Sequence, residues 1–291
     1  MHALRIYEAE ARSILSATTG FIAAAGFTHS LTPARNCTYG CTYCYVPTLG
    51  IYGGLKPDDW RNWGQFSTFK SNAASLLRRE LRPQQVIYCS PLVDPYQPAE
   101  ADARRMPAIL EALAEHPPRA FTLQTRGPLI LRDLDALVAL AARTILRVSF
   151  SITTDREEIR RRYEPHCAPL ADRWDTVRAL NRAGIETYAT LAPLLPCDPE
   201  ALIGLAIGAT TGDIIGDPLH TRVSKPRGAT TREAALKISH ASGFEAWHEP
   251  GFQDALVARM AQYARAAGRC FVTGTEGFSR LARVGCFAAR S

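Results

Sequence analysis

The sequence predicts an α/β fold in which parallel strands and helices alternate along most of the 291-residue chain. Short β-branched or aromatic runs bounded by Gly, Pro or Asp indicate strands, and amphipathic patterns between them indicate helices. Crossovers of this length place successive strands parallel. Six such units between residues 27 and 216 suggest a partial barrel, since a closed eight-unit barrel takes roughly 250 residues. A doubly wound open sheet is the competing architecture.

The expected elements follow from these patterns in chain order. FTHSLT opens the series as a first strand, and NAASLLRRELR places Ala74, Leu77 and Leu81 on one helical face. Strands are expected at 27–32, 86–90, 121–125, 145–153, 185–192 and 211–216. Helices are expected at 72–82, 103–115, 133–142, 171–183 and 199–208.

Two segments lie outside this alternation. Residues 45–69 are rich in Gly, Pro and Trp and are expected to form a long ordered loop. Residues 217–291 carry helical patterns near 230–241 and 252–267. We therefore expect residues 1–216 to form the barrel, and residues 217–291 to form a C-terminal helical extension that packs on it.

The composition excludes several classes of protein. Hydrophobic residues make up 46% and charged residues 21%, which argues against a disordered, collagen-like or coiled-coil chain. No run reaches the roughly 18 apolar residues of a membrane helix. The N-terminal residues are acidic where a signal peptide is basic and then apolar. A cytoplasmic protein without membrane contact is expected. The net charge of +6 permits nucleic-acid binding without demonstrating it.

Three of the eight cysteines lie together, at Cys37, Cys41 and Cys44, directly after the first expected strand. Loops after the carboxyl ends of parallel strands build active sites. Three thiolates suit an iron–sulfur cluster with one iron left open, whereas a structural zinc needs a fourth ligand, His29 or a distant cysteine. Apart from Cys89, the remaining four cysteines are expected to be structural thiols. Two of them stand beside loop prolines from which they could approach the site, Cys167 and Cys197.

The spacing C-x3-C-x2-C, with an aromatic residue before the last cysteine, resembles the signature of the radical S-adenosylmethionine (radical SAM) superfamily. Further segments resemble its DNA-repair-photolyase-like or spore-photoproduct-lyase-like branch, and the resemblance covers roughly residues 10–200. The segments that carry it are 36–45, 90–100, 125–135, 148–154, 162–165 and 192–196.

The resemblance implies a partial (β/α)6 TIM-like barrel and a radical enzyme. Cys37, Cys41 and Cys44 would ligate three irons of a [4Fe–4S] cluster, and S-adenosyl-L-methionine would chelate the fourth. An electron from a donor such as flavodoxin or ferredoxin would then give methionine and a 5′-deoxyadenosyl radical, which abstracts a substrate hydrogen. A DNA photolesion is one candidate substrate. The alternatives are a small metabolite, nucleoside or peptide, or a non-catalytic nucleic-acid-binding protein stabilised by zinc or a cluster.

The resemblance also suggests cofactor contacts. Tyr43 would pack near the adenine, and the backbone of Ala192 would contact the same ring. Asp94 would accept hydrogen bonds from the ribose hydroxyls. The competing interpretation is a turn residue, because Asp before Pro is common in turns. Arg126 stands where relatives often carry a lysine that meets the methionyl carboxylate.

Four further positions complete the expected site. Ser149 and Ser151 share one face of their strand and would donate to the same carboxylate. The competing interpretation is that they are ordinary polar residues of a strand without a role in binding. Tyr45 follows the cluster motif and would face the substrate or be a buried structural tyrosine. Cys89 ends the second expected strand and would return a hydrogen to the product radical. The competing interpretation of Cys89 is a small apolar strand residue.

Overall fold

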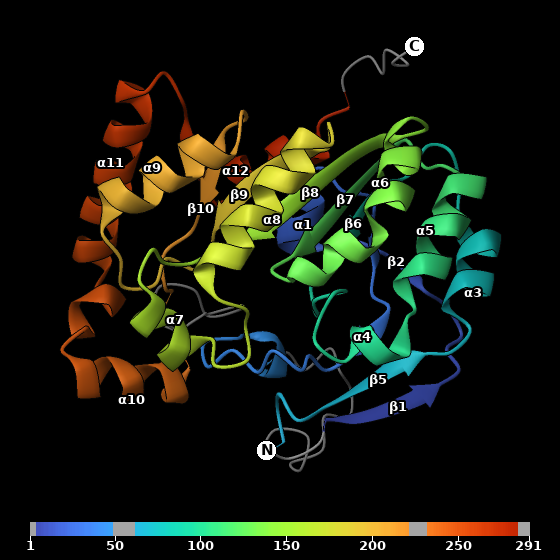
Figure 1. Ribbon diagram of the computed structural model, residues 1–291, viewed down its shortest axis with the longest axis horizontal. Coiled ribbons are helices and arrows are strands. Elements are labelled where there is room, and N and C mark those ends of the chain that lie inside the picture. Colours follow the sequence, from blue (N-terminus) through green and yellow to red (C-terminus); the bar gives the residue numbers. More distant parts are fainter. Residues whose placement is uncertain (1–3, 49–61, 221–231, 285–291) are drawn as a thin grey trace.

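The computed structural model describes residues 4–48, 62–220 and 232–284, and its centre is an eight-stranded sheet (Figure 1). The strand order is β11-β10-β9-β8-β7-β6-β3-β2, and every neighbouring pair is parallel except β2 with β3. The strand bounds are β2 Leu15–Ala17, β3 His29–Leu31, β6 Val86–Cys89, β7 Ala120–Thr125, β8 Ile145–Ser151, β9 Glu186–Leu191, β10 Ile214–Gly216 and β11 Phe271–Thr273.

The expected α/β class is confirmed, and all six expected strands lie in this sheet. From β3 to β11 the strands follow one another in chain order without a reversal, whereas a doubly wound sheet reverses its order at a switch point. The doubly wound alternative is therefore wrong. Within the described chain β2 and β11 pair with no further strand, so the sheet is open.

A layer of helices covers one face of the sheet, because right-handed crossovers that always step in one direction fall on one side. These helices bury an apolar stripe; α5, for example, buries Met106, Ile109, Leu110 and Leu113. Their bounds are α3 Ala73–Glu80, α5 Met106–Glu115, α6 Leu134–Ala141, α8 Leu170–Arg182 and α9 Pro199–Ala209. The short elements α4 Glu100–Ala103, η3 Pro128–Asp133 and α7 Glu157–Tyr163 lie in the connections.

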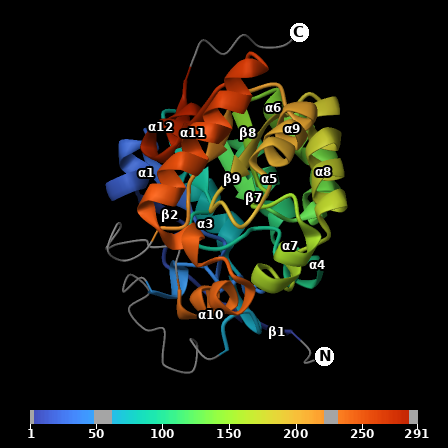
Figure 2. The same ribbon diagram turned by 90° about the vertical axis from the view of Figure 1, so that its left-hand side faces the viewer.

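The opposite face of the sheet is covered by α12 (Gly274–Ala282) and α1 (Gly20–Ala24), which lie beside each other (Figure 2). Thr122 of β7 donates a 2.8 Å hydrogen bond to the carbonyl of Leu281, which fixes α12 against the strands. Phe27, Tyr88 and Phe278 pack together in this layer. Helix α12, near the C-terminal end of the described chain, thus covers this inner face of the main sheet.

The segment after residue 216 also contains the strand β11, which the sequence did not reveal. Its three residues pair with β10, and the Phe271 ring packs over Gly216, where a side-chain Cβ would lie only 2.2 Å from the ring. The remaining elements of this segment are α10 Glu233–Ser242, η4 Glu245–His248 and α11 Pro250–Ala266. No described helix is long and apolar enough to cross a membrane.

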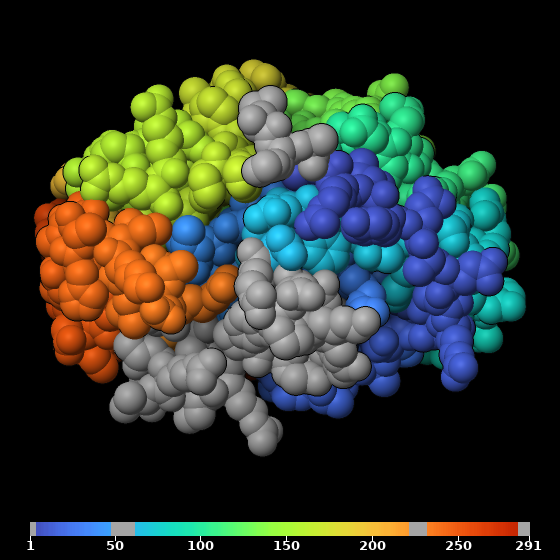
Figure 3. Space-filling model, turned by 90° about the horizontal axis from the view of Figure 1, so that it is seen from below, coloured from blue at the N-terminus to red at the C-terminus, as the bar shows by residue number. Residues whose placement is uncertain are grey.

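A second, three-stranded sheet lies below the main one and has the order β1-β5-β4. Its strands are β1 Arg5–Ala9, β4 Ala34–Arg35 and β5 Phe66–Lys70. The expected loop at 45–69 therefore contains the one-turn η1 (Val46–Thr48) and the start of β5, and its residues 49–61 lie outside the described part. Seen from below, α10 (orange) lies on the left of the molecule, whereas the dark blue and cyan chain that carries β1 and β5 lies in the middle and to the right (Figure 3).

Candidate active site

The three clustered cysteines lie in a tight loop that begins directly after β4. Asn36 and Gly40 both adopt positive φ angles (64° and 59°), which turns the chain sharply twice. Backbone hydrogen bonds from Gly40 to Cys37 and from Cys44 to Cys41, 3.3 and 3.2 Å long, close two successive turns. As a result, all three cysteine side chains line one cavity of about 270 Å³.

Gln97 stabilises the cysteine loop by hydrogen bonds to its backbone. The side chain of Gln97 accepts a 2.8 Å hydrogen bond from the Thr38 N–H and donates to the carbonyl of Asn36 at 3.3 Å. Gln97 is fully buried, so these bonds are shielded from water. Its neighbour Glu100 faces away, accepts from the backbone of Met106 and pairs with Arg132.

Residues at the carboxyl ends of the strands form the remaining walls of the cavity. Asp94 follows β6, Arg126 follows β7, Ser151 ends β8 and Ala192 follows β9, and all four line the cavity. Tyr43 and Tyr45 line it from the cysteine loop. Nine of the eleven expected site residues are thereby brought together, as the position of parallel strand ends predicts.

Asp94 is both a turn residue and a cavity residue. Its Oδ1 accepts from the Tyr96 N–H at 2.9 Å and from the Thr125 hydroxyl at 2.6 Å, and its Oδ2 accepts from the Arg126 N–H at 2.8 Å. Burial raises the pKa of the Asp94 carboxyl, and the contacts with Thr125 and Arg126 oppose this rise. Because Oδ2 has this one hydrogen-bond donor among the described residues, it retains the capacity to accept another.

Arg126 belongs to a buried charge network. Its Nη1 is 2.6 Å from Glu164 Oε1, 2.5 Å from the Tyr43 hydroxyl and 3.3 Å from the Cys41 sulfur. The other oxygen of Glu164 pairs with Arg173 at 2.6 Å, with both side chains fully buried. One carboxylate is therefore shared by two guanidinium groups next to a cluster-loop cysteine, and these three groups together carry a net positive charge.

The electrostatics of Glu164 and Cys41 reflect this network. Burial acts to raise the pKa of Glu164, but the charges of Arg173 and Arg126 outweigh it and lower the pKa to about 2. The pKa of Cys41 also lies below its usual value, because the Cys167 side chain hydrogen-bonds its sulfur and Arg126 lies nearby, against the effect of burial. Burial raises the pKa of Cys44 to about 11.

Two expected residues do not reach the cavity wall. Cys89 is fully buried in the apolar cluster between the sheet and the outer helices, because strand alternation turns Tyr88 and Ser90 toward the cavity instead. Ser149 lies one pleat deeper than Ser151 and exchanges a 2.6 Å hydrogen bond with Thr190.

The roles of three residues around the cysteine loop were not predicted from the sequence, although the sequence did indicate that Cys167 could approach the site. Gln97, Glu164 and Cys167 lie in segments that the resemblance includes or borders, but each has a partner in the cysteine loop that is 59 to 126 positions away along the chain. These partners are Thr38 for Gln97, Tyr43 for Glu164 and Cys41 for Cys167. Glu164 pairs with Arg126 and Arg173 and not with its neighbour Arg162, which donates to Ser242.

The donor set fits an iron–sulfur cluster. Three thiols, none of them in a disulfide among the described residues, share one wall of a cavity and leave its centre open, which suits a cluster that has one iron without a protein ligand. On the facing walls the buried hydroxyls of Tyr88 and Ser90 have no hydrogen-bond partner within the described residues. Buried hydroxyls normally have partners, so these two are donors available to a bound molecule.

Comparisons with known proteins agree with this geometry. The family model described as Radical SAM superfamily matches residues 31–201. The uncharacterized protein Rv2578c of Mycobacterium tuberculosis (strain ATCC 25618 / H37Rv) is 28% identical over 214 residues, which cover 69% of this chain and 62% of that protein. The uncharacterized protein MJ0683 of Methanocaldococcus jannaschii is 26% identical over 170 residues, or 58% of this chain and 61% of that protein. The chain thus spans less than two thirds of the length of these relatives.

Solved structures share the fold. Spore photoproduct lyase complexed with dinucleoside spore photoproduct superposes with a TM-score of 0.63 over 92% of this chain and 81% of that chain, at 13% identity. A variant of the lyase with bound AdoMet and the same dinucleoside gives a TM-score of 0.62 at the same identity and coverage.

Proposed function

Because the chain belongs to the radical SAM superfamily, we propose that it is an enzyme that removes a hydrogen atom from a substrate held in the cavity beside the cysteine loop. The cofactors of this family, a [4Fe–4S] cluster and S-adenosylmethionine, supply the 5′-deoxyadenosyl radical by reductive cleavage. The observation that carries the proposal is the meeting of Cys37, Cys41 and Cys44 with four strand-end residues around one cavity.

The residues of the cavity have separate tasks in this proposal. Cys37, Cys41 and Cys44 hold three irons. Asp94 Oδ2 accepts a ribose hydroxyl, and the backbone at Ala192 faces the adenine. Arg126 Nη2 is a long 3.4 Å from the Ser151 hydroxyl, so Nη2 keeps donor capacity for the methionyl carboxylate. Nη1 is held by Glu164, and the Ser151 hydroxyl donates to the carbonyl of Ala192 at 3.4 Å.

The aromatic wall keeps water from the reacting atoms. Phe21, Tyr88 and Phe278 line the cavity on the side of α1 and α12, and Phe21 and Phe278 pack edge to face at 5.1 Å. A carbon radical needs such a closed cavity because small thiols and reductants that reach it would quench it. The protein's contribution is therefore positioning and shielding.

A dinucleoside photolesion in DNA is the first candidate substrate. It is supported by the fold shared with spore photoproduct lyase and permitted by the net charge of +6. Among the described residues that line the cavity, Arg126 is the one cation. It is paired with Glu164, and the carboxylates of Asp94 and Asp217 also line the cavity. We therefore expect an uncharged part of the substrate to enter the cavity, with any phosphates outside it. The scarcity of cations on the described cavity walls equally supports the second candidate, a neutral small metabolite, nucleoside or peptide.

Anaerobic reconstitution tests the proposal. The reconstituted chain is expected to bind about four irons, to change its spectrum on addition of S-adenosylmethionine, and to release 5′-deoxyadenosine once flavodoxin, ferredoxin or a chemical reductant supplies electrons. Binding of zinc without iron, or a spectrum that ignores S-adenosylmethionine, would contradict it. Turnover of a dinucleoside lesion against a panel of nucleosides and peptides then separates the two substrate candidates.

Asp94→Asn is expected to weaken S-adenosylmethionine binding. A hydrogen bond to a charged acceptor is worth about 1.5–3 kcal/mol, so the dissociation constant should rise at least about tenfold. The matched control is Asp133→Asn, a buried aspartate that pairs with Arg132 away from the cavity. Equilibrium binding and thermal unfolding of both variants check the prediction, which is wrong if the two variants bind S-adenosylmethionine equally well.

A further inference from the structure

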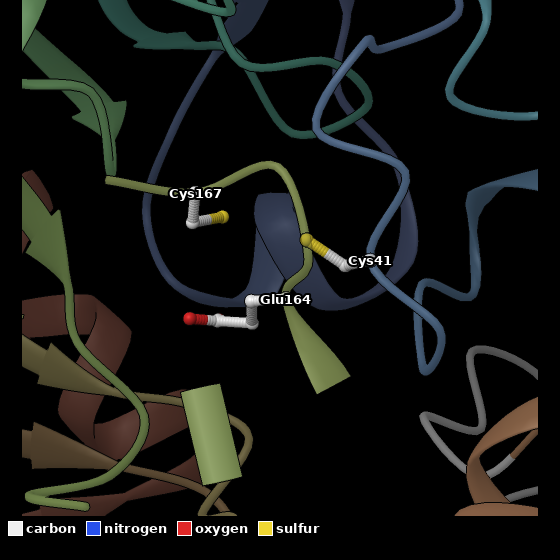
Figure 4. A group of neighbouring side chains, drawn as sticks. All are labelled: Cys41, Glu164 and Cys167. Atoms are coloured by element: carbon white, nitrogen blue, oxygen red, sulfur yellow. The ribbon is translucent and has the colours of Figure 1, made fainter. Parts of the chain in front are cut away.

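A fourth cysteine lies behind the cluster loop. Cys167 follows α7 in the segment 163–167, and it is buried. Its sulfur, the Cys41 sulfur and a carboxylate oxygen of Glu164 all lie within 4.8 Å of one another. Figure 4 shows the two sulfurs pointing toward each other, with Glu164 extending away below them.

The segment that carries Cys167 is fastened to the cluster loop. The backbone N–H and the hydroxyl of Thr42 both donate to the carbonyl of Tyr163, at 3.0 and 3.2 Å. Arg160 Nη1 donates to the carbonyl of Cys167 at 2.7 Å, and the Cys167 N–H donates to the carbonyl of Glu164 at 3.1 Å. These bonds fix the position of Cys167 relative to Cys41.

The cysteine pair and Glu164 do not form a separate cation site. The two oxygens of Glu164 are already paired with Arg126 and Arg173, at 2.6 Å each. Two guanidinium groups at this distance would repel a metal ion, and the carboxylate has no charge left to offset it. Of the two groups beside the Cys167 thiol, the sulfur of Cys41, within 4.8 Å, is therefore the one that can take it as a partner.

We propose that Cys167 is a positioning residue that donates an S–H hydrogen bond to the Cys41 sulfur and thereby makes the cluster easier to reduce. The inference rests on the proposed function, in which Cys41 is a cluster ligand. A ligated thiolate can only accept, so the thiol of Cys167 is the donor. Reduction adds negative charge to the cluster and its sulfurs, and hydrogen bonds to those sulfurs stabilise the added charge. Arg126 Nη1, 3.3 Å from the same sulfur, acts in the same direction.

The reduction potential of the reconstituted full-length protein tests the inference. In Cys167→Ala, and in Cys167→Val, which keeps the side-chain volume, iron content should match the wild type. The equilibrium constant for one-electron reduction should fall about tenfold, which is a shift of about 59 mV to more negative potential. Cys167→Ser retains a donor and should restore most of this shift. The matched control is Cys197→Ala, a buried cysteine that does not line the cavity.

Redox titration followed by electron paramagnetic resonance gives the potentials, and an iron assay accompanies it. Unchanged potentials in both the Ala and Val variants would overturn the inference while leaving the proposed function intact. Loss of iron from these variants would also overturn it, because Cys167 would then be a ligand. A wild-type chain that binds no four-iron cluster would instead refute the proposed function, and the inference with it.

Discussion

Replacement of Cys37 or Cys44 by alanine is expected to leave a folded chain without a complete cluster and to reduce 5′-deoxyadenosine formation to background. Each side chain supplies one of three thiolates, and two thiolates do not hold a four-iron cluster with an open iron. Among the described residues that line the cavity there is no further cysteine to take the vacant place. The loss should therefore be close to complete for each variant.

The fold should survive these substitutions, because other side chains hold the loop. Gln97 clamps Thr38 and Asn36, and Thr42 is bonded to the carbonyl of Tyr163. Thermal unfolding of the cluster-free variants is thus expected near that of the cluster-free wild type. Iron analysis and chromatographic assay of 5′-deoxyadenosine measure the effect, with Cys197→Ala as the control. Retained cleavage of S-adenosylmethionine by Cys37→Ala would refute the ligand assignment.

The parts of this site that the sequence predicts are those set by local spacing and by strand ends. The cysteine triplet is compact, and the resemblance placed Asp94, Arg126 and Ser151 where strands stop. The carboxyl ends of parallel strands lie at the same edge of a sheet. These residues therefore lie close together in a barrel and in an open sheet alike. The alternation of strands and helices likewise predicts the α/β class, whereas the order of the strands, which excludes the doubly wound sheet, comes from the structure.

The parts that the sequence does not reveal depend on contacts between distant segments. Strand 86–89 is buried on both faces, so its composition does not tell which side chain meets the cavity, and Tyr88 rather than Cys89 does. Tyr43 and Glu164 are 121 positions apart and meet only because α7 packs beside the cluster loop. The three-residue β11 is too short to show a period.

Glu164→Gln is expected to lower the free energy of unfolding by about 3–5 kcal/mol, because it leaves the buried guanidinium groups of Arg126 and Arg173 without a counter-charge. The amide would also bring N–H donors toward groups that can only donate. The matched control is Glu115→Gln, an exposed partner of Arg78, for which little change is expected because water screens an exposed ion pair. Denaturant unfolding of the two variants and the wild type measures the difference.

The pH dependence of stability shows whether Glu164→Gln destabilises the protein by removing a charge or by changing the packing. The pKa of Glu164 falls from 4.5 to about 2 on folding, so the folded state binds fewer protons than the unfolded state in this range. Its contribution is therefore fully present above pH 4.5 and is lost as the pH falls toward 2. The shift corresponds to about 3 kcal/mol, which agrees in size with the cost expected for removing the charge. The stability difference between wild type and Glu164→Gln should accordingly shrink between pH 4.5 and 2. A difference that stays constant over this interval would mean that Glu164 stabilises the fold by its shape and not by its charge.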